Sequence, residues 1–168
     1  NVNQLPNVSA GADQSVCVGT QVTLIGLDAV SYTWSPAITD GVPFTPPTGT
    51  TTYTVTGTSA AGCINTDQVV VTVNTTPLVD AGTYPPVCSD VATVALVGAP
   101  LGGTFTGTGV AGTNFATSSG SQTVTYSFTD ANGCFGSTTA NITVNALPVV
   151  AGGTDVTICA GQTITLSA

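Results

Sequence analysis

The chain has 168 residues and a formal net charge of −8, carried entirely by Asp, with no Lys, Arg, His, Glu or Met. Because contacts to phosphates need Lys or Arg, this composition argues against nucleic-acid binding and against attraction to anionic lipid. Without His, Lys, Arg or Glu the chain can build no Ser-His-Asp triad, Cys-His pair or cationic oxyanion clamp, so we predict that it is not an enzyme. No apolar run reaches the length of about 18 residues that direct membrane insertion needs.

The five cysteines recur at fixed spacing along the chain. Cys17 and Cys63 are 46 positions apart, as are Cys88 and Cys134, and the second pair follows the first by 71 positions. Cys159 follows Cys88 by the same interval. Self-similarity at a fixed period indicates a tandem array of structural units.

The period divides the chain into small domains. A domain of this size buries only about 60% of the surface of its unfolded chain, so it commonly needs a covalent link to be stable. We predict the tail of a preceding repeat, two complete domains and the truncated start of a third repeat, at residues 1–5, 6–76, 77–147 and 148–168.

The cysteine spacing predicts one disulfide within each domain. The expected pairs are Cys17–Cys63 and Cys88–Cys134, and Cys159 is expected to have no partner within this chain. Closing a loop of this length contributes on the order of 4 kcal/mol. Paired cysteines indicate an oxidising compartment, so we expect an extracellular or cell-surface location. A zinc site is the alternative, but the chain has no His and no CxxC motif.

Each unit opens at a proline, and these are Pro6, Pro77 and Pro148. Proline fixes φ, and the residue before it is pushed towards extended geometry. Each joint is therefore predicted to be short, stiff and extended.

Alternation of apolar and polar residues predicts the strands of the first unit. Residues 21–24 and 30–34 fit half-buried strands, and residues 52–56 and 69–73 fit the two arms of a hairpin. Between them, residues 35–50 are rich in Pro and Gly and predict a loop with at most short edge strands. Together these elements predict an all-β fold.

The second unit repeats the hairpin with a stronger turn. Residues 124–128 and 140–144 alternate, and the segment 130–133 between them contains Asn-Gly, which favours a tight turn. The segment 107–120, the counterpart of the Pro-rich loop, is rich in Gly and Ser. Such loops can carry recognition, but relaxed constraint also produces such variation, and we favour that explanation.

Large aromatic residues recur at positions that suit the core of a sandwich. Trp34 and Phe105 are separated by the same 71 positions as the cysteine pairs, and so are Phe44 and Phe115. Packing between two sheets explains them better than a stacking platform for carbohydrate. The predicted core residues are Trp34, Phe44, Tyr53, Phe105, Phe115 and Tyr126.

Calcium is the one metal to consider, because carboxylates near interdomain joints rigidify many extracellular arrays. Asp80 lies close to its joint, and Asp13 and Asp155 lie shortly after theirs. No DxDxDG loop is present, and Tyr84 stands at the counterpart of Asp13. We therefore predict no metal site and no cofactor, with these three residues as the only weak candidates.

The last segment, 148–168, matches 6–26 at more positions than it matches the start of the second unit. Proline, glycine, aspartate and cysteine all recur at corresponding places. This suggests that two repeat types alternate along a longer array.

Four motifs carry a resemblance to a known family. They are Tyr-Thr-Trp-Ser-Pro at 32–36, Thr-Tyr-Thr-Val at 52–55, Thr-Asp-Ala-Asn-Gly-Cys at 129–134, and the Pro-x-Val-x-Ala-Gly joints. Together they resemble the immunoglobulin-like and PKD-like repeats of very large surface proteins of Bacteroidota, including gliding-motility-associated adhesins exported by type IX secretion. The resemblance implies a β-sandwich unit in a long extracellular stalk. The Trp-Asp-Phe-Gly-Asp-Gly type of motif found in PKD domains is missing after Trp34, which favours a generic immunoglobulin-like sandwich.

Two functions remain after these considerations. The first is a structural spacer in an extracellular filament or surface adhesin, whose partners are neighbouring repeats and whose Thr-rich sheet edges could support homotypic assembly. The second is a carbohydrate- or protein-binding adhesion module that uses the loops at 43–47 and 107–112. Buried Phe44 and Phe115 would favour the spacer.

Overall fold

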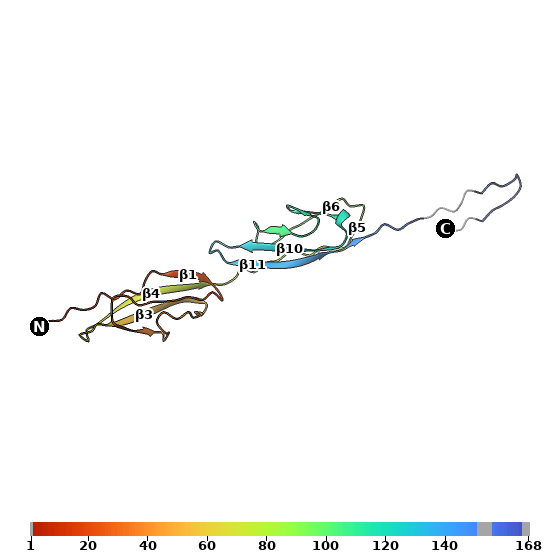
Figure 1. Cartoon of the computed structure of the whole chain (residues 1–168). Helices are drawn as coiled ribbons and strands as arrows, with labels where there is room; N and C mark the ends of the chain where they lie inside the picture. Colours follow the sequence, from red (N-terminus) through yellow and green to blue (C-terminus); the bar gives the residue numbers. More distant parts are fainter. Residues whose placement is uncertain (1, 151–155, 166–168) are drawn as a thin grey trace.

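The computed structural model describes residues 2–150 and 156–165. In these residues the chain is all-β, and the only helical element is the short 3-10 turn η1 (Thr117–Ser119). The strands form two units, β1 to β4 and β5 to β12, each packed around its own hydrophobic core. The two units lie end to end in an elongated molecule (Figure 1). The predicted fold class is therefore confirmed.

The first unit is built on a four-stranded sheet. Its strands are β1 (Gln14–Cys17), β2 (Ser31–Ser35), β3 (Gly49–Thr58) and β4 (Ile64–Asn74), in the order β1-β4-β3-β2. The central pair β3 and β4 forms the predicted hairpin, with ten antiparallel register pairs. β1 runs parallel to β4, so it ends at the same end of the unit as β4 does.

A second layer covers one face of this sheet and closes the first core. Two isolated bridges, Ser9 with Leu27 and Val22 with Phe44, join the segments of this layer. The predicted strand at 21–24 is therefore reduced to a single bridge. Its partner segment contains Pro43, and a proline has no N–H to extend a ladder. The buried core residues are Val8, Ala10, Val22, Leu24, Trp34, Tyr53, Val55, Val69, Val71 and Val73.

The second unit divides its strands among three small sheets. The orders are β11-β10-β7, β12-β5 and β6-β9-β8, and the pair of β12 and β5 is parallel. The antiparallel pair β10 and β11 is the predicted second hairpin. The strand bounds are β5 (Val87–Cys88), β6 (Thr93–Ala95), β7 (Thr104–Thr106), β8 (Val110–Ala111), β9 (Asn114–Ala116), β10 (Gln122–Thr129), β11 (Phe135–Ile142) and β12 (Val144–Asn145).

The segment 107–120, predicted as a loop, contains two of these strands and the 3-10 turn. It is ordered because its one large aromatic residue, Phe115, is fully buried and anchors β9 to the second core. Glycines at both ends permit the reversals, since Gly107, Gly109 and Gly120 have positive φ. The buried residues of this core are Ala81, Leu96, Phe105, Phe115, Val124, Tyr126 and Ile142.

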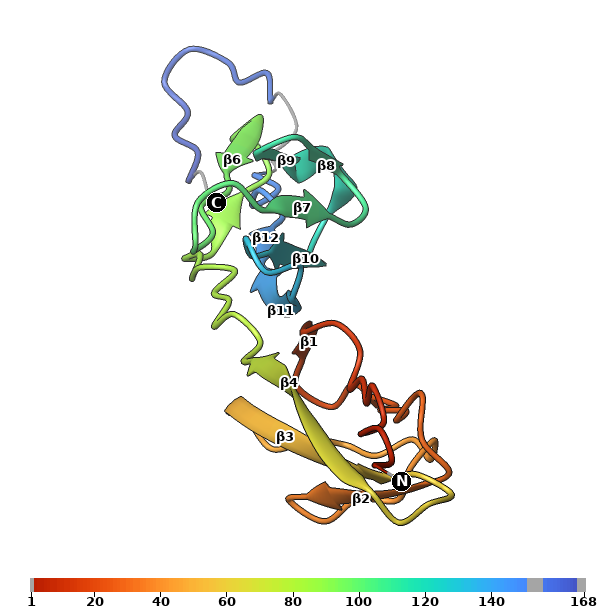
Figure 2. The same ribbon diagram turned by 90° about the vertical axis from the view of Figure 1, so that its left-hand side faces the viewer.

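The two units have the same strand register at the C-terminal ends of their last strands. Cys17 pairs with Asn74 at the end of β1 and β4, and Cys88 pairs with Asn145 at the end of β5 and β12. Both residues of the second pair follow those of the first by 71 positions. A view turned by 90° shows that the β10–β11 turn of the second unit lies next to the end of β1 in the first (Figure 2).

Residues 156–165 of the predicted third repeat are exposed and belong to no strand. A turn is nevertheless present at Cys159, whose carbonyl accepts a hydrogen bond from the N–H of Gln162 at 3.1 Å. Cys17 and Cys88 make the same type of turn with Thr20 and Val91.

Candidate functional site

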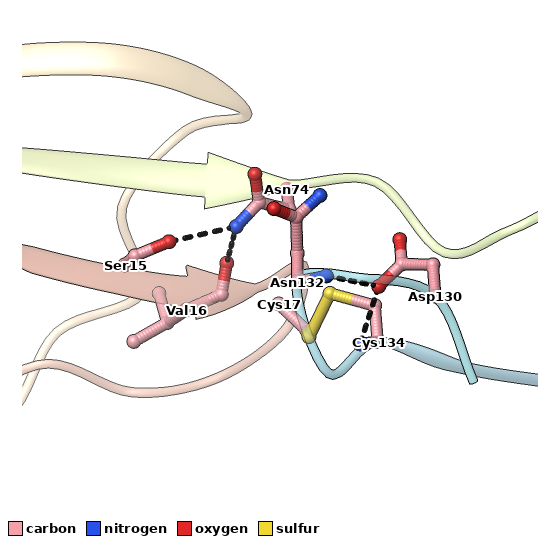
Figure 3. Close-up of a disulfide and its surroundings, with 7 residues drawn as sticks. All are labelled: Ser15, Val16, Cys17, Asn74, Asp130, Asn132 and Cys134. Carbon is pink, nitrogen blue, oxygen red and sulfur yellow. Dashed lines mark hydrogen bonds between the residues drawn. A yellow bond between two sulfur atoms is a disulfide. The ribbon is translucent and has the colours of Figure 1, made fainter.

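The junction between the two units has the most specific side-chain chemistry in the described structure. Its first half is the end of β1, where Cys17 lies opposite Asn74. The Asn74 side chain donates hydrogen bonds from Nδ2 to Oγ of Ser15 at 2.9 Å and to the carbonyl of Val16 at 3.3 Å. Its backbone carbonyl accepts from the N–H of Val18 at 2.8 Å. Asn74 therefore holds the residues on both sides of Cys17, and Figure 3 shows its bonds to Ser15 and Val16.

The second half is the tight turn between β10 and β11. Oδ1 of Asp130 accepts hydrogen bonds from the N–H of Asn132 at 2.9 Å and of Cys134 at 2.8 Å. Gly133 has φ of +81°, a conformation that favours glycine, and its N–H donates to the carbonyl of Asp130. The turn places Cys134 at the tip of the hairpin, where its side chain is fully buried.

A disulfide joins the two halves. Cys17 and Cys134 are bonded, with their Cα atoms 5.5 Å apart and a sequence separation of 117. Figure 3 shows the bond between the end of β1 and the β10–β11 turn. The bridge therefore connects one unit to the next.

This pairing corrects the predicted bridges Cys17–Cys63 and Cys88–Cys134, and with them the expectation of one disulfide inside each domain. Cys63 directly precedes β4, and Cys17 lies beside the last residue of β4. The 11 residues of that strand hold the two cysteines about 35 Å apart at the usual rise per residue. A disulfide requires Cα atoms within about 7 Å. The same separation, along β11 and β12, keeps Cys88 away from Cys134.

The other cysteines of the described chain carry free thiols. Cys63 is half-buried, whereas Cys88 and Cys159 are exposed. The Cys63 Sγ lies 4.0 Å from the carbonyl oxygen of Asn3. All three thiols are therefore open to reaction with a partner or a reagent.

The aromatic residues predicted for the core lie in or against the two cores. Trp34, Tyr53, Phe105, Phe115 and Tyr126 are buried. Phe44 is half-buried and packs against the first core, where its ring meets the Tyr53 ring edge-on at 5.3 Å between centroids. In the second unit the rings of Phe105 and Tyr126 lie 4.5 Å apart.

The carboxylates considered for calcium are engaged with the backbone. Oδ1 of Asp13 accepts from the N–H of Val70 at 2.8 Å, and Oδ1 of Asp80 accepts from the N–H of Gly82 at 2.9 Å. Asp155 lies outside the described residues. Within the described part of the chain, no three Cys or Asp side chains come together as a metal site.

One carboxylate that the sequence did not single out ties the second layer of the first unit to its sheet. Oδ2 of Asp67 on β4 accepts a hydrogen bond from the N–H of Ala10 at 2.8 Å. The backbone N–H donors of Ala10 and, to a lesser extent, Gln68 hold the pKa of Asp67 below its ordinary value. The only signal in the sequence is an Asp within a strand that otherwise consists mainly of apolar residues and Thr. This pattern does not reveal that Ala10 is its partner.

Each unit has a shallow hollow at a corresponding place. In the second unit it has a volume of about 400 Å³ and is lined by Asp80, Tyr84 and Val97 among others. In the first unit it has a volume of about 260 Å³ and is lined by residues that include Ala10 and Leu27. The second hollow contains one charged and one aromatic side chain, Asp80 and Tyr84, and the lining of the first contains neither kind.

No helix in the described residues is long and apolar enough to cross a membrane.

Comparison with known proteins gives only distant structural similarities. No protein-family profile matches the sequence, and no curated protein matches it. Among solved structures, Sidekick-1 immunoglobulin domains 1–5 align at a TM-score of 0.41 and 15% identity, over 84% of this chain and 39% of that one. Sidekick-1 immunoglobulin domains 1–4 align at 0.39 and 16% identity, over 83% and 48%. Mouse cadherin-23 EC22–24 aligns at 0.34 and 12% identity, over 85% and 67%. The chain thus spans less than half the length of either Sidekick-1 structure.

Proposed function

We propose that this chain is a structural spacer, a segment of a long extracellular stalk or filament that holds apart what lies at its two ends. The observation that carries this proposal is the Cys17–Cys134 bridge across the junction between the two units. The surface adhesins of Bacteroidota that the sequence resembles are the setting we propose for it.

The bridge supports a stiff junction because it adds a second connection to one that is already short. The polypeptide leaves β4 at Asn74 and enters the second unit through Pro77, whose ring fixes φ. At that point Pro77 and Val79 lie so close to Gly136 on β11 that a Cβ there would come within 2.7 Å of each. Two covalent connections on different strands restrict both bending and rotation between the units.

The burial of aromatic residues favours the spacer over an adhesion module. Phe115, from the Gly-rich segment, is fully buried, and Phe44, from the Pro-rich segment, packs against the first core. These loops therefore present neither phenylalanine as a stacking platform for carbohydrate.

The chemistry of the junction also supports an extracellular location. A disulfide persists in oxidising compartments and is rare in the reducing cytosol. The partners we propose are neighbouring units of the same kind, along the chain or in parallel stalks.

Small-angle X-ray scattering of the oxidised chain tests the spacer. We expect one elongated particle with a narrow distribution of inter-unit angles, and a broader distribution for the double variant C17S/C134S, in which only the polypeptide joins the units. The matched control C63S/C88S removes two thiols that form no bridge and should leave the scattering unchanged. A wide range of angles in the oxidised chain, with the bridge formed, would refute the stiff spacer.

A further inference from the structure

We propose that Cys63 and Cys88 each form a disulfide with a cysteine of a neighbouring unit of the same kind. Each is one half of a bridge like the one between Cys17 and Cys134. Cys63 would receive the cysteine at the end of the β1-like strand of the preceding unit, and Cys88 would receive the cysteine of the hairpin turn of the following unit. This inference rests on the proposed spacer function and names the partner of its junctions.

The turn that carries Cys63 already has the geometry of the turn that carries the bonded Cys134. In the second unit the N–H of Cys134 donates to the side chain of Asp130 at 2.8 Å, and its carbonyl accepts from the N–H of Asp130 at 3.0 Å. In the first unit the N–H of Cys63 donates to Oγ of Ser59 at 3.1 Å, and its carbonyl accepts from the N–H of Ser59 at 2.9 Å. Ser59 stands one period before Asp130 in the sequence and takes the same part in its turn.

The glycines of the two turns agree as well. Gly62 and Gly133 both have positive φ, of 78° and 81°. Each donates its N–H to the carbonyl of the residue that begins its turn, at 2.9 and 3.1 Å. The half-site at Cys63 is therefore preformed, although no bridge is present there.

The surroundings of Cys63 also contain a residue that would pair with the strand of the preceding unit. Its Sγ lies 4.0 Å from the carbonyl oxygen of Asn3. Asn3 stands one period before Asn74, which is the residue opposite Cys17 at the bonded junction. A strand that paired with Val2 and Asn3 as β1 pairs with β4 would bring its terminal cysteine to Cys63.

Cys88 shows the complementary half. It stands opposite Asn145 in a parallel pair, as Cys17 stands opposite Asn74. The N–H of Ser89 donates to the carbonyl of Asn145 at 2.9 Å, repeating the bond from Val18 to Asn74 at 2.8 Å. Cys88 is exposed. It is thus held like Cys17 but, within the described residues, it forms no disulfide.

Formation of each new bridge is a two-electron oxidation that needs an external oxidant, and we specify a small-molecule disulfide such as oxidised glutathione. One cysteine thiolate attacks the glutathione disulfide, forms a mixed disulfide and releases one reduced glutathione. The second cysteine thiolate attacks the protein sulfur of the mixed disulfide and releases the second. The two cysteine sulfurs give up two electrons, their two thiol protons pass to the two released glutathione thiolates, and one glutathione disulfide becomes two thiols.

A tandem chain of two copies provides the test. Residues 1–147 of the first copy are followed directly by residues 6–168 of the second copy, so that the period of the sequence continues. The segment 148–168 matches 6–26, so this order follows the pattern of the chain itself. Cys63 of the second copy then stands at position 205 of the tandem chain. Its sequence separation from Cys88 of the first copy is 117, the value found in the observed bridge. The first copy also carries C63S and the second carries C88S, which leaves one Cys88 and one Cys63 to meet.

Peptide mapping after refolding in glutathione buffer reads out the bridge. A protease that cleaves before Asp places Cys17, Cys63, Cys88 and Cys159 on the peptides 13–27, 40–66, 80–89 and 155–168, and it places each Cys134 on a peptide that begins at residue 130. We expect the peptide 80–89 to be disulfide-linked to 40–66 in most molecules. The matched control carries C88S in the first copy and C63S in the second. Its remaining Cys63 lies in the first copy and its remaining Cys88 in the second, so they do not face each other across a junction. We expect these two peptides to stay unlinked within one chain.

The outcomes separate this proposal from the spacer function. If Cys17–Cys134 forms in both copies while Cys88 and Cys63 stay reduced, the proposal is overturned and the spacer remains. Equal linkage of 80–89 to 40–66 in the tandem chain and in its control would also overturn it, because the bond would then not depend on the junction. If the predicted linkage forms but scattering shows freely hinged units, the bridge stands and the stiff spacer fails.

Discussion

At the scale of single residues, the acidic side chains of this chain serve mainly as acceptors for backbone N–H groups. With no cationic side chain available, Asp40 accepts from the N–H of Gly26 at 2.7 Å and from Nε1 of Trp34 at 2.9 Å. Asp67 and Asp130 hold a neighbouring segment and a turn in the same way. Hydrogen bonds to a charged acceptor are stronger than those to a neutral one, so each carboxylate fixes a local conformation.

We expect Asp67 to make the first unit sensitive to acid. Its pKa in the folded chain is lowered from the ordinary value of 3.8 by the N–H groups of Ala10 and Gln68. A group of this kind contributes stability that is present above its unfolded pKa and is lost as pH falls through its folded pKa. We therefore expect Asp67→Asn to flatten the loss of stability of the first unit below about pH 4.

Trp34 is the one tryptophan and lies in the first core, so its fluorescence follows denaturation of this unit alone. The measurement is the urea midpoint at a series of pH values. Asp90→Asn, at an exposed position in the second unit, makes the same change in net charge and should leave the profile of the first unit as it is. Identical acid profiles for Asp67→Asn and the parent chain would contradict this assignment.

At the scale of elements, the two hairpins are the framework on which each unit is built. β3 and β4 are paired over ten positions, and β10 and β11 over eight. Their alternating sequences bury Tyr53 and Val55 in one unit, and Val124 and Tyr126 in the other. The shorter elements depend on single anchors, as β9 does on Phe115.

Phe115→Ala should destabilise the second unit by about 3–5 kcal/mol, because truncating a fully buried ring leaves a cavity. Thermal unfolding followed by calorimetry should show one transition moved to lower temperature, while the Trp34 fluorescence transition stays in place. The matched variant Phe44→Ala, at the corresponding but half-buried position, should cost the first unit less. A larger loss for Phe44→Ala would contradict the burial of the two rings.

At the scale of the whole molecule, two units with separate cores are joined by one short linker and one disulfide. All the charge is negative, so the two units repel each other over a distance set by the ionic strength, about 10 Å in 0.1 M salt. The bridge opposes that repulsion at a single point. We therefore expect the closed bridge to limit the change in angle between the units.

Reduction of the bridge should expose this repulsion. We expect the radius of gyration of the reduced chain to rise when salt is lowered from 0.5 M to 0.01 M, a range over which the Debye length grows from about 4 Å to about 30 Å. The oxidised chain should keep the same radius across the range. Scattering at several salt concentrations, with and without reductant, is the measurement. A salt-dependent radius in the oxidised chain would show that the bridge does not hold the junction.

Much of the local structure could be predicted from the sequence, because it depends on neighbouring residues. The alternation at 52–56 and 69–73 predicts the first hairpin, and Asn-Gly predicts the turn before Cys134. The strand at 21–24 is reduced to one bridge by the prolines opposite it, and β8 and β9 form where Gly and Ser predicted a loop. In both segments the outcome depends on a contact distant in the sequence.

The regular recurrence of cysteines in the sequence was enough to indicate an array and an oxidising compartment. It could not reveal which cysteines bond, because the spacing alone does not show that a long, straight strand lies between Cys17 and Cys63. Only the tertiary structure decided this, since β4 carries the two thiols to opposite ends of the unit and brings Cys17 to the turn of the next one. The sequence determined that cysteines and short motifs recur at a fixed spacing, and the extended geometry of a strand determined that the disulfide joins two units.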